Sequence, residues 1–320
     1  MPTRADDLID RRRLRRKLTF WRVLAVALVA IALFAVTSWY FQGSFGTAAN
    51  HIAQVRVEGT ITEDDELLKR LERIRKSPAV KGVIVTVDSP GGTTVGGEAI
   101  FEAIRRLAAE KPVVAQVGTL AASAGYMIAS AADHIVARQS SIVGSIGVLL
   151  QYPDVTGLMD KLGIKLEEIK SSPLKAEPSP FNPTTEEERA MARRLIMDSY
   201  EWFIDLVAER RSLSRAEVVA LADGSIFTGR QAMERKLVDS LGGEQEAKQW
   251  LVGKGVGENL EIVEWKARNS GGSLFLPGFF SKIVARALGL QNYEADLLKQ
   301  IGAERLFLDG LLSVWQPERP

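Results

Sequence analysis

The sequence predicts an α/β protein: a layered core of sheet and helices behind an N-terminal transmembrane helix. Two observations predict this class. Residues 23–41 carry no charge, and beyond residue 50 segments of strand character alternate with segments of helical periodicity. Strands that alternate with helices indicate crossover connections in a layered core. The 320 residues suffice for one domain of catalytic size with appendages at both ends.

The N-terminal region combines a basic cluster with an apolar run. Six of the seven residues in 11–17 are Arg or Lys, and the run 23–41 is 19 residues long. That length spans a hydrocarbon core of roughly 30 Å. By the positive-inside rule residues 1–22 stay in the cytoplasm and everything after the span lies outside it. A removable signal peptide remains the alternative, because residues 46–50 (GTAAN) are small enough for a cleavage site.

The predicted elements follow one another in order. Residues 53–61 alternate as in a strand, and 63–77 have apolar residues at helical spacing. A long helix is predicted to start near Thr184, which forms a capping pair with Glu187. The other predicted strands are 80–89, 112–118, short segments within 133–150, 165–170 and 259–267. The other predicted helices are 97–110, a small-residue helix after Ser123, 156–164, and an interfacial or packing helix at 274–291.

Composition excludes several classes of function. The net charge is +1 and gives no nucleic-acid footprint, so no nucleic-acid partner is expected. The chain has no cysteine, which removes disulfides, thiolate metal sites and cysteine nucleophiles. No metal-binding motif of suitable spacing occurs, so we expect neither metal nor cofactor.

Ser123, in "TLAASAGYMIAS", is either a nucleophile or a small residue at a helix–sheet contact. A nucleophilic serine needs a base, but the two histidines, His51 and His134, both lie at predicted strand starts, where a structural role is favoured. A lysine can replace histidine where desolvation keeps its amine neutral. Lys175 is a candidate for this base in a Pro-bounded, weakly charged segment, with a solvated loop lysine as the alternative.

A second motif could stabilise the negative charge that such a reaction forms. The stretch "VDSPGG" (87–92) is either a plain strand-to-helix turn or a turn whose N–H groups hold an oxyanion.

Taken together, "VDSPGG", "TLAASAGYMIASAAD", "VGSIGV", "GIKLEEIKSSPLKAEPSPFNPTTEEER" and "GSIFTGRQA…KLVDSLGG" resemble the signal peptide peptidase A group of S49 serine peptidases. The resemblance is to the short form with one catalytic domain and covers roughly residues 50–250. It implies a ClpP/crotonase-like fold with a peptidase domain at 46–252 and a C-terminal extension at 253–320. The sequence assigns no role to residues 268–320, and the question of what they do stays open.

The resemblance also implies site residues. Ser123 matches the nucleophile and Lys175 the general base of a Ser/Lys dyad. The N–H groups of Gly92 and Ala124 match the oxyanion hole, and Ser145 falls where a hydroxyl can orient the lysine. Two positions depart from the family pattern. Ala124 and Lys236 each stand at a position where glycine is common in the family.

The family degrades cleaved signal peptides and other apolar peptides and forms ring- or dome-shaped homo-oligomers, in which the lysine can reach the serine of a neighbouring subunit. The resemblance therefore implies a serine endopeptidase anchored in the bacterial cytoplasmic membrane, N-terminus inside, with its catalytic domain on the periplasmic or extracellular side. Three alternatives stay open: a peptidase for specific membrane proteins that works with a stomatin-like partner, a non-catalytic membrane scaffold of the same fold, and a crotonase-like acyl-CoA enzyme.

Overall fold

The computed structural model describes residues 21–31, 49–267 and 312–314. The chain divides into two units, Met1–His51 and Ile52–Pro320. In the first unit residues 21–31 are helical. No helix among the described residues has both the length and the apolar character needed to cross a membrane. The predicted span 23–41 continues beyond the described residues after position 31, and the basic cluster and the predicted helix at 274–291 also lie outside them.

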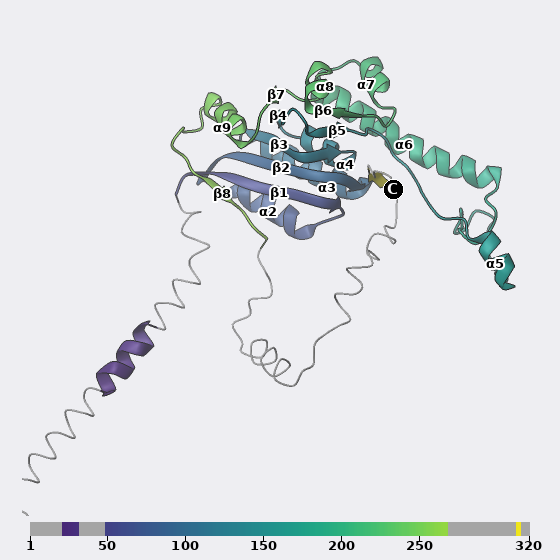
Figure 1. Ribbon diagram of the computed structural model, residues 1–320, viewed down its shortest axis with the longest axis horizontal. Coiled ribbons are helices and arrows are strands. Elements are labelled where there is room, and N and C mark those ends of the chain that lie inside the picture. Colours follow the sequence, from purple (N-terminus) through teal and green to yellow (C-terminus); the bar gives the residue numbers. More distant parts are fainter. Residues whose placement is uncertain (1–20, 32–48, 268–311, 315–320) are drawn as a thin grey trace, which may run out of the picture. The chain divides into compact units, whose positions relative to one another are not determined.

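The strands of the described residues form one sheet (Figure 1). Its main path runs β6-β5-β3-β2-β1-β8, with β4 between β3 and β7 and with β9 on β2. The central strand β3 pairs in parallel with β2, β4 and β5. The strands are β1 (His51–Ile61), β2 (Val80–Thr93), β3 (Val113–Ala122), β4 (His134–Ala137), β5 (Ile142–Gly144), β6 (Ile226–Thr228), β7 (Ser240–Leu241), β8 (Ile262–Glu264) and β9 (Leu312–Val314).

Helices cover both faces of the sheet, and α5 lies apart from it (Figure 1). They are α2 (Asp65–Lys76), α3 (Thr94–Ala108), α4 (Ala124–Ser130), α5 (Thr156–Leu162), α6 (Glu186–Arg211), α7 (Arg215–Leu221), α8 (Gly229–Glu234) and α9 (Glu244–Gly253). Successive side chains of a strand point to opposite faces. Val83, Val85 and Val87 therefore pack with α2, α3 and α4 in the main core, whereas Ile84 packs under α9 with Leu251. Burial on both faces explains the continuous β-branched run of β2.

Most predicted elements are confirmed, and three details differ. Residues 165–170 form no strand: residues 165–169 are exposed, so their apolar members have no sheet to pack against. The long helix is capped by Thr185 with Glu188, one residue after the predicted pair. Residues 90–93 continue β2 as a strand, where a turn was the expectation.

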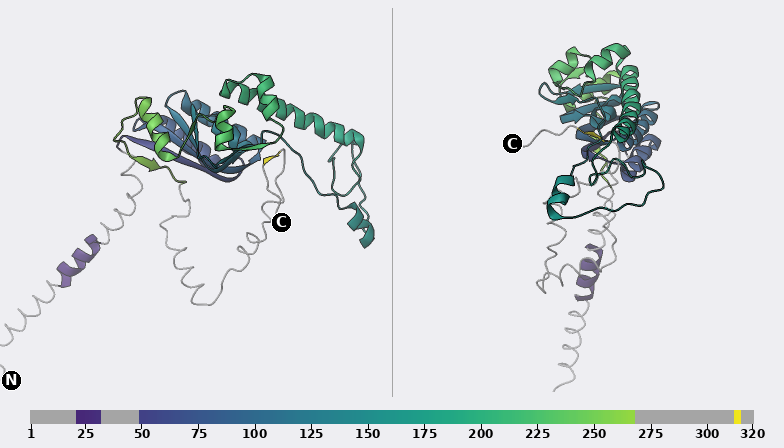
Figure 2. Two further views of the ribbon diagram at one scale, coloured as in Figure 1. Left: turned by 45° about the horizontal axis from the view of Figure 1, so that its top comes forward. Right: turned by 90° about the vertical axis from the view of Figure 1, so that its right-hand side faces the viewer.

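Residues 148–185, with α5, form an arm that extends away from the sheet beside the N-terminal half of α6 (Figures 1 and 2). Few residues of this arm are buried. Several of its large apolar side chains are exposed instead: Leu149, Leu158, Leu162, Ile164, Leu166, Ile169 and Phe181. Apolar side chains gathered on one exposed segment are typical of a surface that packs against another molecule.

Candidate active site

Ser123 lies at the junction between β3 and α4. The strand ends at Ala122 and the helix begins at Ala124, which leaves the serine as the N-cap, with φ 57° and ψ −122°. A non-glycine residue in this region is strained, and such strain persists where the surroundings enforce it. Here the backbone N–H of Ser123 donates to the carbonyl of Gly144 at 2.8 Å, and its own carbonyl accepts from Met127 at 2.9 Å. A sharp strand-to-helix turn is the geometry that presents a nucleophilic serine.

The backbone at Ser145 also has a positive φ. Gly144 has φ 110° and Ser145 has φ 52°. The N–H of Ser145 donates to the carbonyl of Ser225 at 2.7 Å, which ties the end of β5 to the turn before β6. Ser123 and Ser145 line the same cavity, so the structure brings these two predicted residues together.

That cavity measures about 420 Å³ and is largely apolar. Ile146, Val148 and Leu149 form one wall after β5, and Ile196 and Met197 of α6 form another. Ala222, Asp223 and Gly224 form a third wall. It is held to α6 by a hydrogen bond, in which the Tyr200 hydroxyl donates to the carbonyl of Ala222 at 2.6 Å. The sequence patterns did not predict that residues of α6 and Asp223 line this cavity. The motif "GSIFTG" directly follows Asp223 and could have drawn attention to that residue. Such walls suit apolar side chains of a bound peptide.

Asp223 is an acidic residue in the wall of this cavity. Its carboxylate accepts the backbone N–H of Ser225 at 2.9 Å. Hydrogen bonds from the side chain and backbone of Ser225 hold the pKa of Asp223 below its usual value. The carboxylate therefore stays ionised and holds the turn before β6.

Gly92 lies in β2 where two strands come very close. A Cβ at this position would be 1.8 Å from the carbonyl oxygen of Ile61, so no other residue fits without backbone movement. Gly91 before it has φ 105°. The hydroxyl of Ser89 supports this stretch, since it donates to the carbonyl of Gly59 at 2.6 Å and accepts the N–H of Gly91 at 3.1 Å. The two glycines are buried and allow the close approach of backbone at the end of β2.

Ala124 is fully buried at the first turn of α4. The helix packs tightly there: a Cβ on Gly125 would be 2.8 Å from the carbonyl oxygen of Ser89, and one on Gly97 would be 3.1 Å from the Cβ of Ala124. The start of α4 therefore abuts both the glycine segment of β2 and the start of α3. The alanine that departs from the family pattern fits this packing.

The glycine segment also pairs with another strand. Gly91, Gly92 and Thr93 lie opposite Val314, Ser313 and Leu312 of β9 in antiparallel register. An extended segment can therefore add to β2 at the predicted oxyanion residues. Addition of a strand to a sheet edge is a common way for a protein to bind a peptide.

Lys175 is exposed on the arm and does not line the cavity of Ser123. Its backbone N–H donates to the carbonyl of Ser172 at 3.2 Å, as part of a turn. Two charged residues flank this turn: Lys170 forms an ion pair with Glu177, whose side chain is only 5% exposed. Within one chain the structure thus separates Lys175 from the other predicted site residues.

The histidines have other contacts. Nδ1 of His51 lies 2.7 Å from the carbonyl of Ala49, while His134 contacts the Ser240 hydroxyl at 2.9 Å and stacks on Trp250. The described lining of the Ser123 cavity includes neither histidine nor lysine. In the part of the chain that the structure describes, no group of three or more His, Asp or Glu residues could hold a metal ion.

Comparison with known proteins places this geometry in a family. The model described as Peptidase family S49 matches residues 105–255, and that of Clp protease matches 51–144, which confirms the ClpP-like part of the predicted fold. A candidate protease of Methanocaldococcus jannaschii is 38% identical over 219 residues, 68% of this chain and 70% of the relative. A candidate protease of a Synechocystis species is 39% identical over 216 residues, 66% and 76% of the two chains. A candidate signal peptide peptidase of Enterococcus faecium is 30% identical over 265 residues, 78% and 76% of the two. The chain therefore belongs to peptidase family S49.

Proposed function

We propose that this peptidase is a serine endopeptidase that uses Ser123 as nucleophile and Lys175 as general base to cleave apolar peptides, cleaved signal peptides among them. The observation that carries the proposal is the position of Ser123: a strained serine at a strand-to-helix turn, in a cavity with apolar walls. The strand pairing at Gly91–Thr93 supports a peptide substrate, because β9 shows that an extended segment can pair with β2 at these residues.

We further propose that the dyad forms between two copies of the chain. Lys175 lies on an arm with exposed apolar side chains, outside the cavity of its own Ser123. Packing of that arm against a second copy would cover these side chains and take the lysine out of water. Desolvation favours the neutral form of an amine, which is the form that accepts a proton. This arrangement accounts for both the apolar arm and the exposed lysine.

The chemistry follows from these positions. The neutral amine of Lys175 takes the proton of the Ser123 hydroxyl, and Oγ attacks the peptide carbonyl carbon. The N–H groups of Gly92 and Ala124 stabilise the oxyanion. The lysine ammonium then protonates the leaving amine as the C–N bond breaks. A water molecule, deprotonated by the same lysine, attacks the ester, releases the acid product and restores the serine.

The proposed location is the outer face of a bacterial cytoplasmic membrane, with the N-terminus inside. Its support is the uncharged run at 23–41 behind the basic cluster. An anchored peptidase there meets apolar peptides that remain in the bilayer, which agrees with the apolar walls of the cavity.

The test uses the full chain in detergent, with wild type, Ser123→Ala and Lys175→Ala compared on a synthetic apolar signal peptide. Each variant alone should lose about a thousandfold or more in kcat/KM while circular dichroism stays unchanged. Substantial activity in Ser123→Ala would refute the serine mechanism. If wild type is as inactive as both variants, the scaffold alternative gains support.

Mixed assemblies of the two variants test the second part. If the dyad forms between copies, some junctions join an intact serine to an intact lysine, and random mixing restores about a quarter of wild-type activity. If mixed assemblies stay inactive although both chains are present in them, Lys175 acts on Ser123 of its own chain and the dyad itself still stands.

A further inference from the structure

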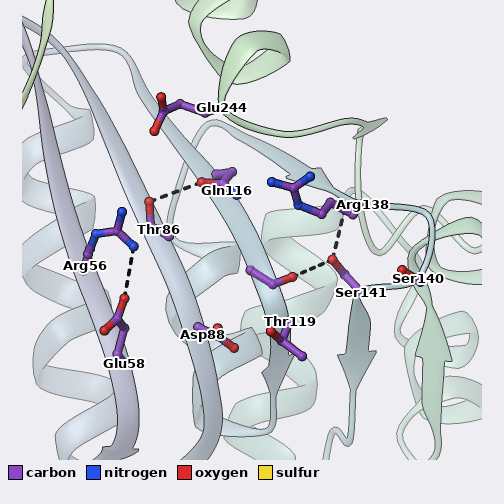
Figure 3. Close-up of a pocket in the computed structure, with 11 residues that line it drawn as sticks. Arg56, Glu58, Thr86, Asp88, Gln116, Thr119, Arg138, Ser140, Ser141 and Glu244 are labelled. Atoms are coloured by element: carbon purple, nitrogen blue, oxygen red, sulfur yellow. Dashed lines mark hydrogen bonds and ion pairs between the residues drawn. The ribbon is translucent and has the colours of Figure 1, made fainter.

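A second cavity, which shares no lining residue with that of Ser123, lies on the face of the sheet that α9 covers (Figure 3). It measures about 590 Å³, within the range of small-molecule sites. Its floor arises from strand alternation: Ile84 and Val114 lie under α9, and two residues further along each strand Thr86 and Gln116 follow. On this face of the sheet the side chains are therefore apolar under α9 and polar beyond the start of that helix.

The polar floor is buried and ordered. Gln54, Thr86 and Gln116 are each 94% or more buried. The Gln54 amide donates to the Thr86 hydroxyl at 3.2 Å and to the Glu244 carboxylate at 2.9 Å, and Thr86 donates to Gln116 at 3.3 Å. Buried polar groups stabilise a fold only when they are hydrogen-bonded. This network therefore fixes the position of Glu244 at the rim of the cavity.

Arg138 lies on the other side of the cavity. It follows the last residue of β4, and its guanidinium extends over the cleft toward Gln116 (Figure 3). Among the described residues no carboxylate forms an ion pair with it, in contrast to Arg56 in the same cavity, which pairs with Glu58 at 3.1 Å and Glu264 at 3.3 Å. The charge of Arg138 acts on the carboxylate of Glu246 without a contact close enough for an ion pair. A guanidinium that forms no such pair is suited to a bidentate contact with the carboxylate of a ligand.

Two carboxylates complement this arginine. Glu244 lies on the far side of Gln116 from Arg138, and Asp88 lies on the floor of the cavity (Figure 3). Asp88 uses one oxygen to accept the N–H of Leu120 at 3.1 Å. A Cβ on Gly118 would be 3.0 Å from the Asp88 carboxylate, so the glycine keeps the floor open beside it. The cavity therefore holds charges of both signs, with Arg138 on one side of Gln116 and Glu244 on the other (Figure 3).

We propose that this cleft binds a small zwitterion, a free amino acid or short peptide, with its carboxylate on Arg138 and its ammonium on Glu244. A ligand with one charge would leave either the arginine or the acidic side of the cleft without a counter-charge. Amino acids and short peptides carry both charges at the spacing of a few bonds, and they are the end products of peptide hydrolysis. The proposal concerns a site separate from Ser123 and does not depend on the serine mechanism.

The test measures binding by titration calorimetry on the full chain with Ser123→Ala, so that hydrolysis contributes no heat. The probes are glycylglycine, glycylglycinamide, which lacks the carboxylate, and N-acetylglycylglycine, which lacks the ammonium. Glycylglycine should bind about tenfold more tightly than either blocked form, because each loses one charged hydrogen-bonded contact. If glycylglycine shows no saturable binding up to ~10 mM, the proposal is overturned, because any remaining affinity would be too weak to matter.

Two variants locate the binding. Arg138→Gln should weaken glycylglycine about tenfold and remove the preference over the amide, whereas Glu244→Gln should remove the preference over the N-acetyl form. Arg106→Gln is the matched control, since Arg106 is an exposed arginine on α3, and it should change nothing. Unchanged affinity in folded Arg138→Gln would place the binding elsewhere and refute the proposed site.

Discussion

The backbone N–H of Ser123 donates a 2.8 Å hydrogen bond to the carbonyl of Gly144. Ala122 pairs with the same glycine in the parallel ladder of β3 and β5. The serine therefore leaves its strand against a fixed neighbour, which accounts for how a non-glycine residue is held at φ 57°. The neighbour itself requires glycine, because its φ is 110° and a Cβ would lie 2.9 Å from the carbonyl oxygen of Ser225.

Gly144→Ala should consequently destabilise the chain and disturb the serine. We expect a loss of about 1–3 kcal/mol in the free energy of unfolding from the forced backbone change. The rate constant kcat should fall about tenfold or more, since the displaced carbonyl no longer fixes Ser123. Urea denaturation and peptide hydrolysis measure the two effects.

Gly253→Ala is the matched control for this substitution. Gly253 ends α9, has open space around its Cβ position and is exposed. The substitution Gly253→Ala should leave kcat unchanged. It should raise the free energy of unfolding by no more than about 1 kcal/mol. Equal behaviour of the two variants would show that Gly144 imposes no special constraint.

Much of the fold follows from local patterns in the sequence. The β-branched run of β2 and the helical spacing of α2 are determined by residues close together in the chain, so periodicity finds them. Residues 165–170 show the limit of this reasoning: their alternation is typical of a strand, but a strand needs a partner, and periodicity carries no information about that. The shift of the helix cap from Thr184 to Thr185 has a similar cause, because both threonines have a glutamate three residues later.

In the candidate site, too, some features depend on residues close together in the chain and others on distant segments. Motifs predict Ser123 and Gly92 as site residues, and local packing explains the backbone geometry at both positions. The α6 side chains Ile196 and Met197 enter the Ser123 cavity from far along the chain, and nothing in their own helical pattern distinguishes them from core residues. The position of Lys175 on an arm could not be predicted either, since it depends on how the segment 148–185 leaves the core.

The ion pair between Lys170 and Glu177 closes the turn that carries Lys175. Hydrogen bonding from Lys170 holds the pKa of Glu177 below its usual value, and its side chain is almost fully buried. Glu177→Gln should release the turn and lower kcat about tenfold with KM little changed, because the lysine is displaced rather than the substrate. Rates at saturating peptide and proteolytic cleavage within 170–177 report the two consequences.

Glu168→Gln is the control on the same lysine. Glu168 contacts Lys170 at 2.6 Å but is 29% exposed, and Lys170 keeps Glu177 when it is lost. We expect a change in kcat below about twofold, as for a partly exposed ion pair. Equal losses in the two variants would argue against a specific role of Glu177.

His134 should titrate below an ordinary histidine. Burial lowers its pKa, and the nearby Asp239 opposes this only in part. Between the folded pKa and the unfolded value of about 6.5, the unfolded chain binds a proton that the folded chain does not. Stability from this residue is therefore complete above about pH 6.5 and declines as the pH falls through that window.

Nuclear magnetic resonance of the imidazole signals can measure this directly, because the chain has two histidines and His134→Gln assigns them. The thermal midpoint of wild type should fall between pH 7.5 and 5.5 by more than that of His134→Gln. An imidazole that titrates at or above about 6.5 would contradict the assignment of burial as the dominant effect.

Lys236 has φ 59° at an exposed position after α8, one of the two positions at which the sequence departs from the pattern that it resembles. A side chain in the left-handed region costs about 1 kcal/mol relative to glycine, while glycine also gives the unfolded chain more freedom. Since the ammonium has no ion-pair partner among the described residues, Lys236→Gly should stabilise the chain by up to about 1 kcal/mol in urea denaturation. Activity should not change, because the position lies outside the Ser123 cavity. Lys236→Ala separates the backbone effect from loss of the side chain: it removes the charge but keeps the strain, so a gain equal to that of glycine would contradict the conformational explanation.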